Sequence, residues 1–550
     1  MSNSKILRII PIGGLGEVGK NMTLYEYGKD VIIVDAGLMF PENDMIGIDY
    51  IIPDFTDIIK SKRDRIRGII ITHGHEDHTG AIQHLLDEVQ APIYATPLTC
   101  GLIEGKLKRN SPSTKAELNR INAGDKIQLG AFNIEFFHVC HSIPDSVGLG
   151  IETPGGLIVH TSDYKLDHTP VDNWPTDYAK LADFANRGVL ALLSDSTNST
   201  QPGWTKSERV IDAALDKVMQ EAEGRVLVAT FASLISRMQQ VADAAKRNGR
   251  KIAFTGRSMV DNFKIASELG YVDIPDRLVV SMEKSLSMPD NQVVLMVTGS
   301  QGEPRSILGR LANGTNHKFD VREGDTIVLS SHPIPGNEES VYRTINNLFR
   351  RGANVIYESI APVHVSGHAS EEEIKLLLNL VQPKYVIPMH GELRMLKQAA
   401  KLAEQVGIAK DHIEVVENGQ VIEFVNGEMR LGKRLPGGYI FVDGSGVGDV
   451  DQDIVRERDT LGRDGVLMVR VDVDDKNGQL KGEPEITTRG FMLEDEFESI
   501  HKGLKNRLKA TVKKSNGNGT LEKEILGAVK SYIFSETKRN PYIFVATNRK

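Results

Sequence analysis

Cysteine is scarce in this chain, which has 550 residues and only two cysteines, Cys100 and Cys140. They stand far apart, and neither belongs to a paired motif for metal binding or redox chemistry. We therefore expect two buried thiols that pack as small hydrophobic side chains, because free cysteine usually behaves in this way. A reducing, cytoplasmic setting fits this usage.

Long apolar runs and an excess of basic residues are also lacking. No stretch reaches the roughly 20 apolar residues that a membrane-spanning helix requires, and the first apolar run is too short for a signal peptide. We therefore expect a soluble protein with no membrane partner. The net charge is −8 and the pI is about 6.1. An acidic net charge is mildly unfavourable for nucleic-acid binding, but it is compatible with a local basic groove.

The length predicts several domains, and the predicted pattern of secondary structure changes near Ser207. Before that point, short apolar runs alternate with turns, as in a β-rich domain. From there to about Ile360, helix-like segments alternate with short apolar strands, which favours a parallel sheet flanked by helices. A Gly- and Asp-rich stretch after Pro436 indicates a linker, and a small αβ domain is expected from about Gly465.

Gly14, Gly16 and Gly19 match the GxGxxG pattern of dinucleotide-binding proteins. That function requires a helix to begin at the glycines, whereas the alternating segment MTLYEY follows them. We therefore interpret the glycines as a tight turn between two strands. Asp35, at the end of the run VIIVD, fits better as a carboxylate behind a metal site than as a ribose-binding acid.

The most informative segment is Thr72–His78, with the sequence THGHEDH directly after an apolar run. Neutral imidazole and carboxylate groups are natural zinc ligands. In a loop, residues two apart can point to a common site, so His73 and His75 can reach one metal while Asp77 and His78 reach a neighbour. A solvated polar loop is the alternative interpretation, but so compact a cluster rarely arises in that way.

Three further ligand candidates, His141, Asp163 and His390, also follow apolar strands. A lone histidine is usually structural, but the shared placement of these residues, together with the segment HGHEDH, reverses that expectation. The order HxHxDH, His, Asp and late His resembles the metallo-β-lactamase superfamily.

That resemblance implies an αββα sandwich that carries two zinc ions. It implies that His73, His75 and His141 hold one ion, that Asp77, His78 and His390 hold the other, and that Asp163 bridges both. Asp35 would orient a ligand histidine from behind. Two metals about 4 Å apart can share a hydroxide and stabilise both oxygens of an in-line displacement. This chemistry suits phosphodiesters, but also lactams, thioesters and lactones.

The long separation of Asp163 from His390 leaves room for an inserted domain, which resembles the β-CASP branch of that superfamily, whose members act on nucleic acids. Three segments carry the likeness: Ser194–Thr197, Ser366–His368 and Pro388–Glu392. The resemblance implies that His368 protonates the leaving 3′-oxygen and that Asp195 orients it. A general acid is needed there because an alkoxide is a poor leaving group at pH 7.

The finer resemblance is to the ribonuclease J family, in segments such as IPIGGLGEVGKN, VDAGLMFPE, HSIPDS, LLSDSTNS, TGSQGEP and HVSGHAS. It implies a 5′→3′ exoribonuclease that favours single-stranded RNA with a 5′-monophosphate, with some endonuclease activity, acting in ribosomal RNA maturation and messenger turnover. The cofactors would be two Zn²⁺ ions per subunit, with Mn²⁺ or Mg²⁺ as alternatives in the activity. A homodimer or homotetramer and an RNA-decay assembly are also implied.

The expected fold is thus an α/β protein: an αββα sandwich interrupted by an α/β β-CASP domain, plus a small αβ C-terminal domain. The expected boundaries are 1–207 and 361–436 for the two parts of the sandwich, 208–360 for the β-CASP domain, 437–464 for the linker and 465–550 for the last domain. The C-terminal part resembles the family only in its size and its predicted αβ pattern, so oligomerisation through this domain is left open.

The resemblance also suggests substrate contacts. The segment from His364 through Val365, Ser366 and Gly367 to His368 would cradle the scissile phosphate with backbone N–H groups and a hydroxyl. Ser233, Leu234 and Ile235 would contact substrate. The pocket for the terminal nucleotide would be lined by Arg257, Ser300, Gln301 and Glu303. Finally, oxygen atoms of Gly47, Asp49 and Asp443 would form a peripheral calcium site, although aspartates in Gly-rich loops usually serve turns.

Two other functions are compatible with parts of this pattern. A small-molecule metallo-hydrolase, such as a thioesterase or lactonase, would share the zinc site, but it needs no inserted domain and leaves His368 unexplained. A non-catalytic scaffold in an RNA-decay assembly would be expected to lack ligands, and none of the expected ligands is missing.

Overall fold

The computed structural model describes residues 6–42, 44–110, 113–474, 479–515 and 521–549. These residues form two compact units. The first unit comprises Met1–Phe40 with Tyr50–Ile440, and the second comprises Pro41–Asp49 with Phe441–Lys550. Among the described helices, none combines the length and the apolar character needed to cross a bilayer.

Two β-sheets form the larger part of the first unit. The strands of the eight-stranded sheet, in spatial order, are β22 (Glu428–Arg434), β21 (Gln420–Val425), β1 (Leu7–Gly13), β3 (Met22–Tyr27), β4 (Asp30–Val34), β6 (Ile66–Ile70), β7 (Ile93–Ala95) and β8 (Leu118–Arg120). Those of the six-stranded sheet are β19 (Tyr385–Met389), β13 (Val189–Asp195), β12 (Gly156–His160), β11 (Val147–Thr153), β10 (Phe132–His138) and β9 (Lys126–Leu129).

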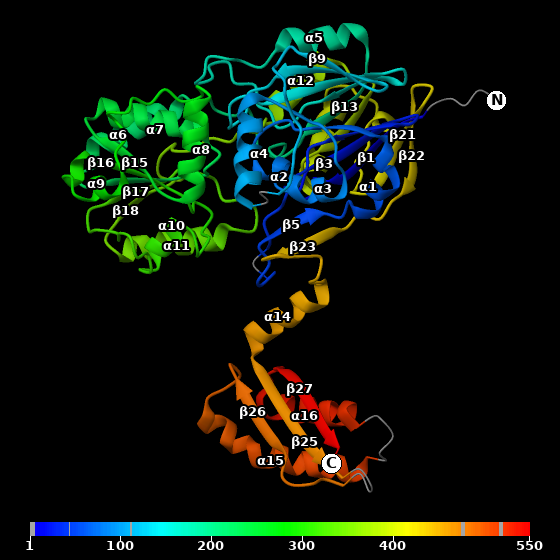
Figure 1. Ribbon diagram of the computed structural model, residues 1–550, viewed down its shortest axis with the longest axis vertical. Helices are drawn as coiled ribbons and strands as arrows, with labels where there is room; N and C mark the ends of the chain where they lie inside the picture. Colours follow the sequence, from blue (N-terminus) through cyan, green and yellow to red (C-terminus); the bar gives the residue numbers. More distant parts are fainter. Residues whose placement is uncertain (1–5, 43, 111–112, 475–478, 516–520, 550) are drawn as a thin grey trace. The chain divides into compact units, whose positions relative to one another are not determined.

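The two sheets pack face to face around a shared apolar core. Ile9 and Ile32 of the larger sheet lie in the same buried cluster as Phe136 and Leu149 of the smaller one. β4 and β13 are buried along their whole lengths, which explains their nearly continuous apolar runs, because central strands are covered on both faces. Figure 1 shows β21 and β22, late in the sequence, beside the N-terminal strand β1, with which β21 pairs antiparallel.

Helices cover the outer faces of this sandwich. On the smaller sheet, Phe184, Leu377 and Leu402 from three helices pack into one cluster with strand residues. The helices are α5 (Tyr178–Arg187), α12 (Glu371–Val381) and α13 (Leu393–Gln405). In the larger sheet, β4, β6, β7 and β8 pair in parallel, and parallel crossovers place their helices on a sheet face. The remaining helices here are α1 (Thr56–Lys62), η1 (Arg63–Arg65), α2 (Glu76–Thr79), α3 (Ile82–Glu88), α4 (Pro97–Asn110) and η3 (Lys410–His412).

A parallel five-stranded sheet is inserted between β13 and β19. Its strands, in spatial order, are β15 (Lys251–Phe254), β16 (Val293–Val297), β14 (Val226–Ala229), β17 (Thr326–Leu329) and β18 (Asn354–Ile356). The helices of this part are α6 (Val210–Glu221), α7 (Ile235–Arg247), α8 (Arg257–Glu268), α9 (Met282–Leu286), η2 (Asp290–Gln292), α10 (Ile307–Ala312) and α11 (Glu338–Arg350). One apolar cluster joins α6 and α7 to one face of the sheet, and another joins α10 and α11 to the other.

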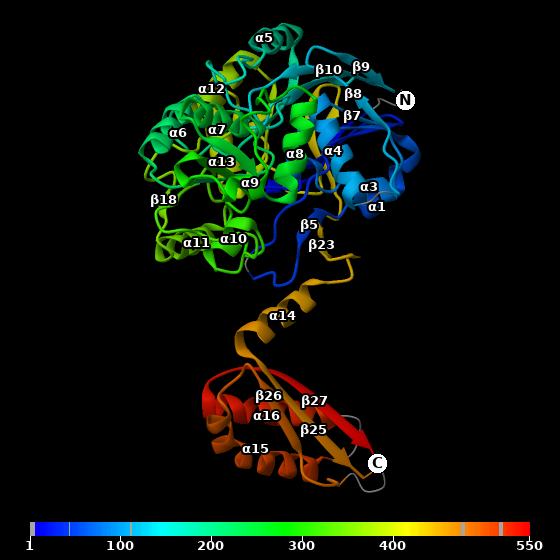
Figure 2. The same ribbon diagram turned by 60° about the vertical axis from the view of Figure 1, so that its left-hand side comes forward.

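The inserted part, green in Figures 1 and 2, packs directly on the sandwich through α8 and α4. A Cβ atom at Gly101 or Gly105 of α4 would lie 2.9 Å and 2.8 Å from Ile265 of α8, respectively. The two helices therefore approach closely because α4 has glycine at the contact. The expected αββα sandwich with an α/β insertion is confirmed.

Three strands and two long helices form the body of the second unit. β25 (Val466–Val473) pairs antiparallel with β26 (Glu485–Arg489) and parallel with β27 (Tyr542–Arg549). α15 (Glu494–Lys514) and α16 (Leu521–Thr537) cover the face that carries Leu467, Val469 and Val471. This agrees with the expected small αβ domain. The stretch 437–464 is more ordered than the expected linker, since it contains β23 (Tyr439–Asp443), β24 (Gly446–Val447) and α14 (Gln452–Asp464).

The glycine-rich segment near the N-terminus is a turn, as expected. Gly14, Gly16 and Gly19 have φ values of +88°, +78° and +117°, and Gly16 belongs to the short strand β2 (Leu15–Gly16). No helix begins there, because the next element is the strand β3. β2 pairs with β20 (Gly391–Glu392), directly after His390. The first unit also contains the strand β5 (Tyr50–Pro53).

A buried ion pair generates a prediction about stability. Arg225 and Asp325 in the inserted part are both 1% exposed, and their side chains are joined at 2.9 Å and 2.5 Å. Asp325→Ala leaves the guanidinium buried without its counter-charge, so we expect a loss of about 3–5 kcal/mol. Differential scanning calorimetry should show this as a lowered unfolding temperature. Lys217→Ala, at an exposed pair with Glu221, is the control; an equally small shift for both variants would contradict the prediction.

Candidate metal centre and catalytic residues

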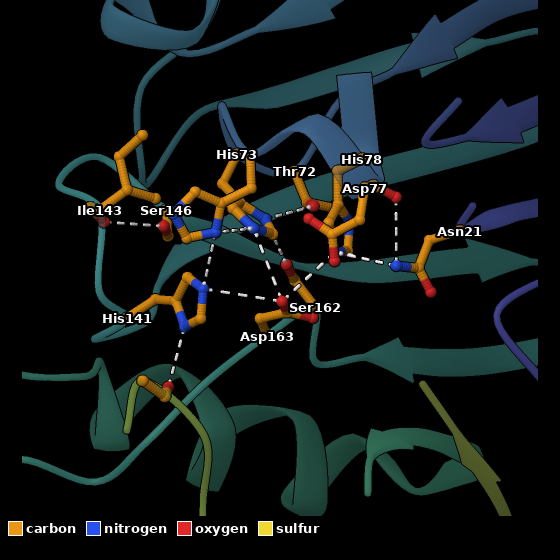
Figure 3. A network of polar contacts seen from close by, with 12 residues as sticks. Asn21, Thr72, His73, Asp77, His78, His141, Ile143, Ser146, Ser162 and Asp163 are labelled. Atoms are coloured by element: carbon orange, nitrogen blue, oxygen red, sulfur yellow. Dashed lines mark hydrogen bonds and ion pairs between the residues drawn. The ribbon is translucent and has the colours of Figure 1, made fainter. Parts of the chain in front are cut away.

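The seven expected ligands come together at one end of the sandwich, each just beyond the end of a strand. The loop after β6 carries His73 and His75 and leads into α2, which carries Asp77 and His78. The loops after β10, β12 and β19 supply His141, Asp163 and His390. Figure 3 shows His73, Asp77, His78, His141 and Asp163 turned toward one another. The shared strand-end placement that the sequence indicated is therefore a shared position in space.

Four of these side chains form a first group. His75 Nδ1 lies 3.2 Å from His73 Nε2 and 3.1 Å from His141 Nε2, and Asp163 Oδ2 lies 3.6 Å from each of those Nε2 atoms. Ligand atoms placed about 2.0–2.2 Å from a tetrahedral zinc ion are about 3.3–3.6 Å apart. The spacing and the chemistry of the four donors therefore fit one divalent metal ion.

A second group shares Asp163 with the first. His78 Nε2 lies 3.2 Å from Asp163 Oδ2 and 3.5 Å from Asp77 Oδ2, which in turn lies 3.2 Å from His390 Nε2. These distances again match the edges of a tetrahedral zinc site. Because one carboxylate belongs to both groups, the arrangement can hold two ions side by side with Asp163 between them.

Outer partners fix the orientation of the histidines. In four of them a neighbour holds Nδ1, so that Nε2 faces the centre. The pairs are His78 with Asp35 at 2.8 Å, His141 with the Gly367 carbonyl at 2.8 Å, His390 with Thr197 Oγ1 at 2.7 Å and His73 with Thr72 Oγ1 at 3.1 Å. Such partners set the tautomer and the ring position of metal-bound histidines.

Burial and charge divide the histidines into two kinds. Burial lowers the pKa of His73 and His141, and lowers that of His75 to about 4. These three rings are therefore neutral at pH 7, as metal ligands must be. Burial also disfavours the charged form of His390, but Asp163 and nearby carboxylates outweigh it and raise its pKa to about 10.

The carboxylates explain why this centre attracts cations. Three buried aspartates, Asp35, Asp163 and Asp195, and the partly exposed Asp77 lie close together. Within the described residues their ion pairs are all with histidines. A buried carboxylate requires a nearby positive charge. Without lysine or arginine in the cluster, that charge must come from protonated imidazole or from bound metal.

His368 lies directly beside the metal groups. Its Nδ1 is 2.7 Å from Asp195 Oδ2, its ring centroid is 5.1 Å from that of His141, and its side chain is 20% exposed. Burial opposes its charged form, but Asp195 outweighs burial and raises the pKa of His368. A partly accessible imidazole whose pKa is raised by a neighbouring carboxylate is well suited to donate a proton.

The segment from His364 to Gly367 is close to the metal centre, and two of its polar groups accept hydrogen bonds from the site histidines. The Gly367 carbonyl accepts a hydrogen bond from His141, and Ser366 Oγ accepts one from the His368 N–H. A Cβ atom at Gly367 would lie 2.7 Å from His141 Nδ1, so glycine is required for this approach. Val365 is buried, and the buried Nδ1 atom of half-buried His364 has no hydrogen-bond partner.

The other expected substrate contacts lie in the inserted part. Ile235 is buried in an apolar cluster at the start of α7, and Leu234, just before it, is also buried. Contact of these two residues with substrate would therefore involve their backbone. Ser233 is partly exposed just before them. The side-chain amide of Gln301 donates to the His332 carbonyl and accepts from the Ile334 N–H, both after β17. The backbone N–H of Gln301 donates to the Glu303 carboxylate. Ser300 Oγ is buried without a hydrogen-bond partner. Arg257 is exposed at the start of α8.

Gly47, Asp49 and Asp443, the expected calcium ligands, lie in the second unit. Asp49 Oδ2 accepts a hydrogen bond from the Gly444 N–H at 2.8 Å, and Asp443 is paired with Arg458 at 2.8 Å. A Cβ atom at Gly47 would also meet Arg458. These carboxylates serve a turn and an ion pair, and they are absent from the candidate metal groups found among the described residues.

Several site residues were missed by the sequence reasoning. Thr72, Ser162 and Thr197 contact ligand histidines through their hydroxyls, and their positions next to ligands or motifs could have revealed them. Asn21 gave no such signal, yet its amide nitrogen lies 3.1 Å from His78 Nε2. It reaches the site because Gly37 allows close approach: a Cβ atom there would lie 1.6 Å from the Asp77 carbonyl.

Fold and site together define a divalent-metal hydrolase of the metallo-β-lactamase superfamily with a β-CASP insertion. Family models agree with this classification: the metallo-β-lactamase superfamily matches residues 15–168, and a Zn-dependent metallo-hydrolase RNA specificity domain matches 352–416. The β-CASP domain of ribonuclease J matches 223–348, and the ribonuclease J C-terminal domain matches 453–549.

Similar proteins narrow the classification further. The chain is 40% identical to ribonuclease J2 of Bacillus subtilis over 98% of both chains. It is 41% identical to ribonuclease J of Thermus thermophilus over 98% of this chain and 94% of that one. The chain therefore belongs to the ribonuclease J family, as its motifs predicted. A protein of unknown function from Enterococcus faecalis shares the fold, with a TM-score of 0.54 and 14% identity over 76% of this chain and 100% of that one.

The contact between Asp35 and His78 predicts an effect on metal affinity. Asp35→Asn removes the charge that holds His78 Nδ1, so we expect about 10- to 100-fold weaker zinc binding. Competition with a zinc-sensitive chelator would measure this loss. Asp125→Asn, at an exposed turn, should leave the affinity unchanged; equal affinities for the two variants would show that Asp35 does not support the centre.

Proposed function

We propose that the chain is a metal-dependent ribonuclease, a 5′→3′ exonuclease that prefers 5′-monophosphorylated single-stranded RNA and has some endonuclease activity. The observation that carries this proposal is the His368–Asp195 pair beside two metal-ligand groups. A small-molecule metallo-hydrolase would use the ligand groups but would have no evident need for that pair or for the inserted domain. Ribosomal RNA maturation and messenger turnover are the processes that we expect it to serve.

Two zinc ions would be held by the ligand groups described above, one by His73, His75 and His141 and the other by Asp77, His78 and His390, with Asp163 shared. Bound there, they would supply Lewis acidity to the phosphodiester and lower the pKa of the attacking water. The protein's part is to hold the ligand rings in the correct orientation, which Asp35, Gly367 and Thr197 do by contacting Nδ1 of His78, His141 and His390, respectively.

His368 would protonate the leaving 3′-oxygen. With Nδ1 held by Asp195, its Nε2 is the ring atom that remains to carry the proton to substrate. Asp195 is a positioning residue in this scheme, because it contacts His368 and lies 3.3 Å from His390 Nδ1, so that it aligns the acid with a metal ligand. The raised pKa of His368 favours the protonated form that a general acid requires.

Substrate contacts would come from both parts of the first unit. Ser366 and His364 lie in the segment that touches His141 and would be near the scissile phosphate. Ser300, Gln301, Glu303 and Arg257 would receive the 5′-terminal nucleotide, where the exposed guanidinium of Arg257 suits a 5′-phosphate. We further expect a homodimer or homotetramer, participation in an RNA-decay assembly, and a cytoplasmic location, which the two free buried cysteines fit.

Digestion of one RNA, labelled separately at each end, tests this proposal. With zinc-loaded protein and a 5′-monophosphate, we expect release of labelled mononucleotide from the 5′ end and a shortening 3′-labelled strand. A 5′-triphosphate should suppress this pattern. Turnover of a thioester without any RNA cleavage would instead favour the small-molecule hydrolase.

Replacement of the proposed acid gives a separate prediction. His368→Ala should lower kcat on RNA by about 10²- to 10⁴-fold, because general acid catalysis contributes about that much. Its zinc content should remain that of the wild type, since other side chains complete both ligand groups. His317→Ala, an exposed histidine in the inserted part, is the control. A His368→Ala enzyme with full activity would exclude the proposed proton donor.

A further inference from the structure

Both tryptophans of the chain, Trp174 and Trp204, are on the surface. Their exposed fractions are 43% and 50%, which is unusual for residues that normally bury most of their area. Each lies in a loop that contains other rings. Together they form what we call the aromatic patch: Trp174, Trp204, His168, Tyr178 and the underlying His138.

The rings of the aromatic patch are arranged as stacking surfaces. Trp174 lies flat on His138, with ring centroids 3.9 Å apart and an interplanar angle of 8°. His168 lies 6.0 Å from Tyr178 at 21°, and also 6.0 Å from Trp204. One face of Trp174 is therefore covered by His138, while much of the ring remains accessible. Single exposed aromatic residues need no explanation, but a cluster of them marks an interaction surface.

The two loops that carry the tryptophans are fixed to each other. Ser207 Oγ donates to the Thr169 carbonyl, and Arg209 donates to Asn173 Oδ1 at 2.6 Å. The Glu208 N–H donates to buried Asp167. Because these bonds join the loops around Trp174 and Trp204, the two rings belong to one preformed surface, which lowers the entropic cost of binding.

The same loops are joined to the candidate active site. Thr205, next to Trp204, donates through Oγ1 to the His368 carbonyl at 2.7 Å, and its N–H donates to Glu373. On the other side, the Trp174 carbonyl accepts from Cys140 Sγ, one residue before His141. The aromatic patch is therefore continuous with the segments that hold the proposed acid and a metal ligand.

Charge also favours a polyanion over an apolar partner. Lys206 and Arg209 are exposed on the loop of Trp204. The carboxylates of Asp172 and Asp177 accept the N–H groups of Trp174 and Lys180 and keep their charge, so the loop of Trp204 is the side of the patch that presents cations. Aromatic faces bordered by cations are the combination that binds unpaired nucleobases with little sequence preference.

We propose that the aromatic patch stacks unpaired bases of the RNA substrate outside the catalytic centre. This inference rests on the proposed function and extends it to a second point of contact with the same strand. Stacking needs free base faces, so the patch selects single-stranded over paired RNA. It also retains the strand between successive cleavage events.

Intrinsic fluorescence tests the contact directly, because the patch contains every tryptophan of the chain. Trp174→Phe leaves Trp204 as the only reporter, and Trp204→Phe leaves Trp174. Titrating each zinc-loaded variant with a hydrolysis-resistant phosphorothioate single strand should quench the remaining tryptophan in a saturable way. Absence of quenching in both variants, or equal quenching by duplex RNA, would overturn the proposal. A change that follows protein concentration but not RNA would reassign the patch to protein contacts.

Kinetics provide the second measurement. Trp174→Ala and Trp204→Ala should each raise KM for a 20-nucleotide RNA by about fivefold to 150-fold, the range for loss of one base stack. Hydrolysis of bis(p-nitrophenyl) phosphate, which has no bases to stack, should be unchanged and reports that the site is folded. Phe349→Ala, an exposed aromatic residue on α11, is the matched control.

The two proposals fail in different ways. If the wild-type protein does not cleave RNA, the proposed function is wrong, while the fluorescence titration still decides whether the patch binds RNA. If the wild type cleaves RNA and both alanine variants match it, the enzyme assignment survives and the aromatic patch has no role in binding substrate.

Discussion

The shared position of Asp163 is the constraint on which the rest of the site depends. Its carboxylate lies within 3.6 Å of a nitrogen atom of His73, His78, His141 and His390, which come from the three segments that follow β6, β10 and β19. Such a carboxylate is costly to bury unless cations or protons surround it. The sandwich meets this requirement by ending four strands at one place, so that each loop contributes ligands without crossing the core.

The inserted domain links this centre to the rest of the first unit. The segment that returns from the insertion carries the Gly367 carbonyl, which orients His141, and His368, which joins Asp195. Glu373, fully buried, accepts N–H groups from Leu166, Thr205 and Ser370. One carboxylate thus fixes the loop after Asp163, the loop of Trp204 and the start of α12. The proposed metal, acid and stacking contacts are therefore parts of one rigid arrangement.

Sequence reasoning succeeded where the signal was local. The strand β4 and the THGHEDH segment have patterns that only a few structures satisfy, and the family motifs extended them to Asp163 and His390. It was less complete where packing or composition masked the outcome. Leu234 and Ile235 stand in a motif expected to contact substrate, but their side chains are buried. The stretch after Pro436 was expected to be a linker because it is rich in Gly and Asp, and it contains a helix whose N-cap, Asp451, is a local signal.

By itself, the sequence determined the family, the order of the domains and the set of residues able to bind metal, because these follow from residue type and spacing. Only the tertiary structure decided which nitrogen of each histidine faces the centre, since that depends on partners as distant as Gly367 and Thr197. It also decided that Asn21 approaches His78 and that two tryptophans share one surface. Such relations arise when separate loops pack together, and no local pattern encodes them.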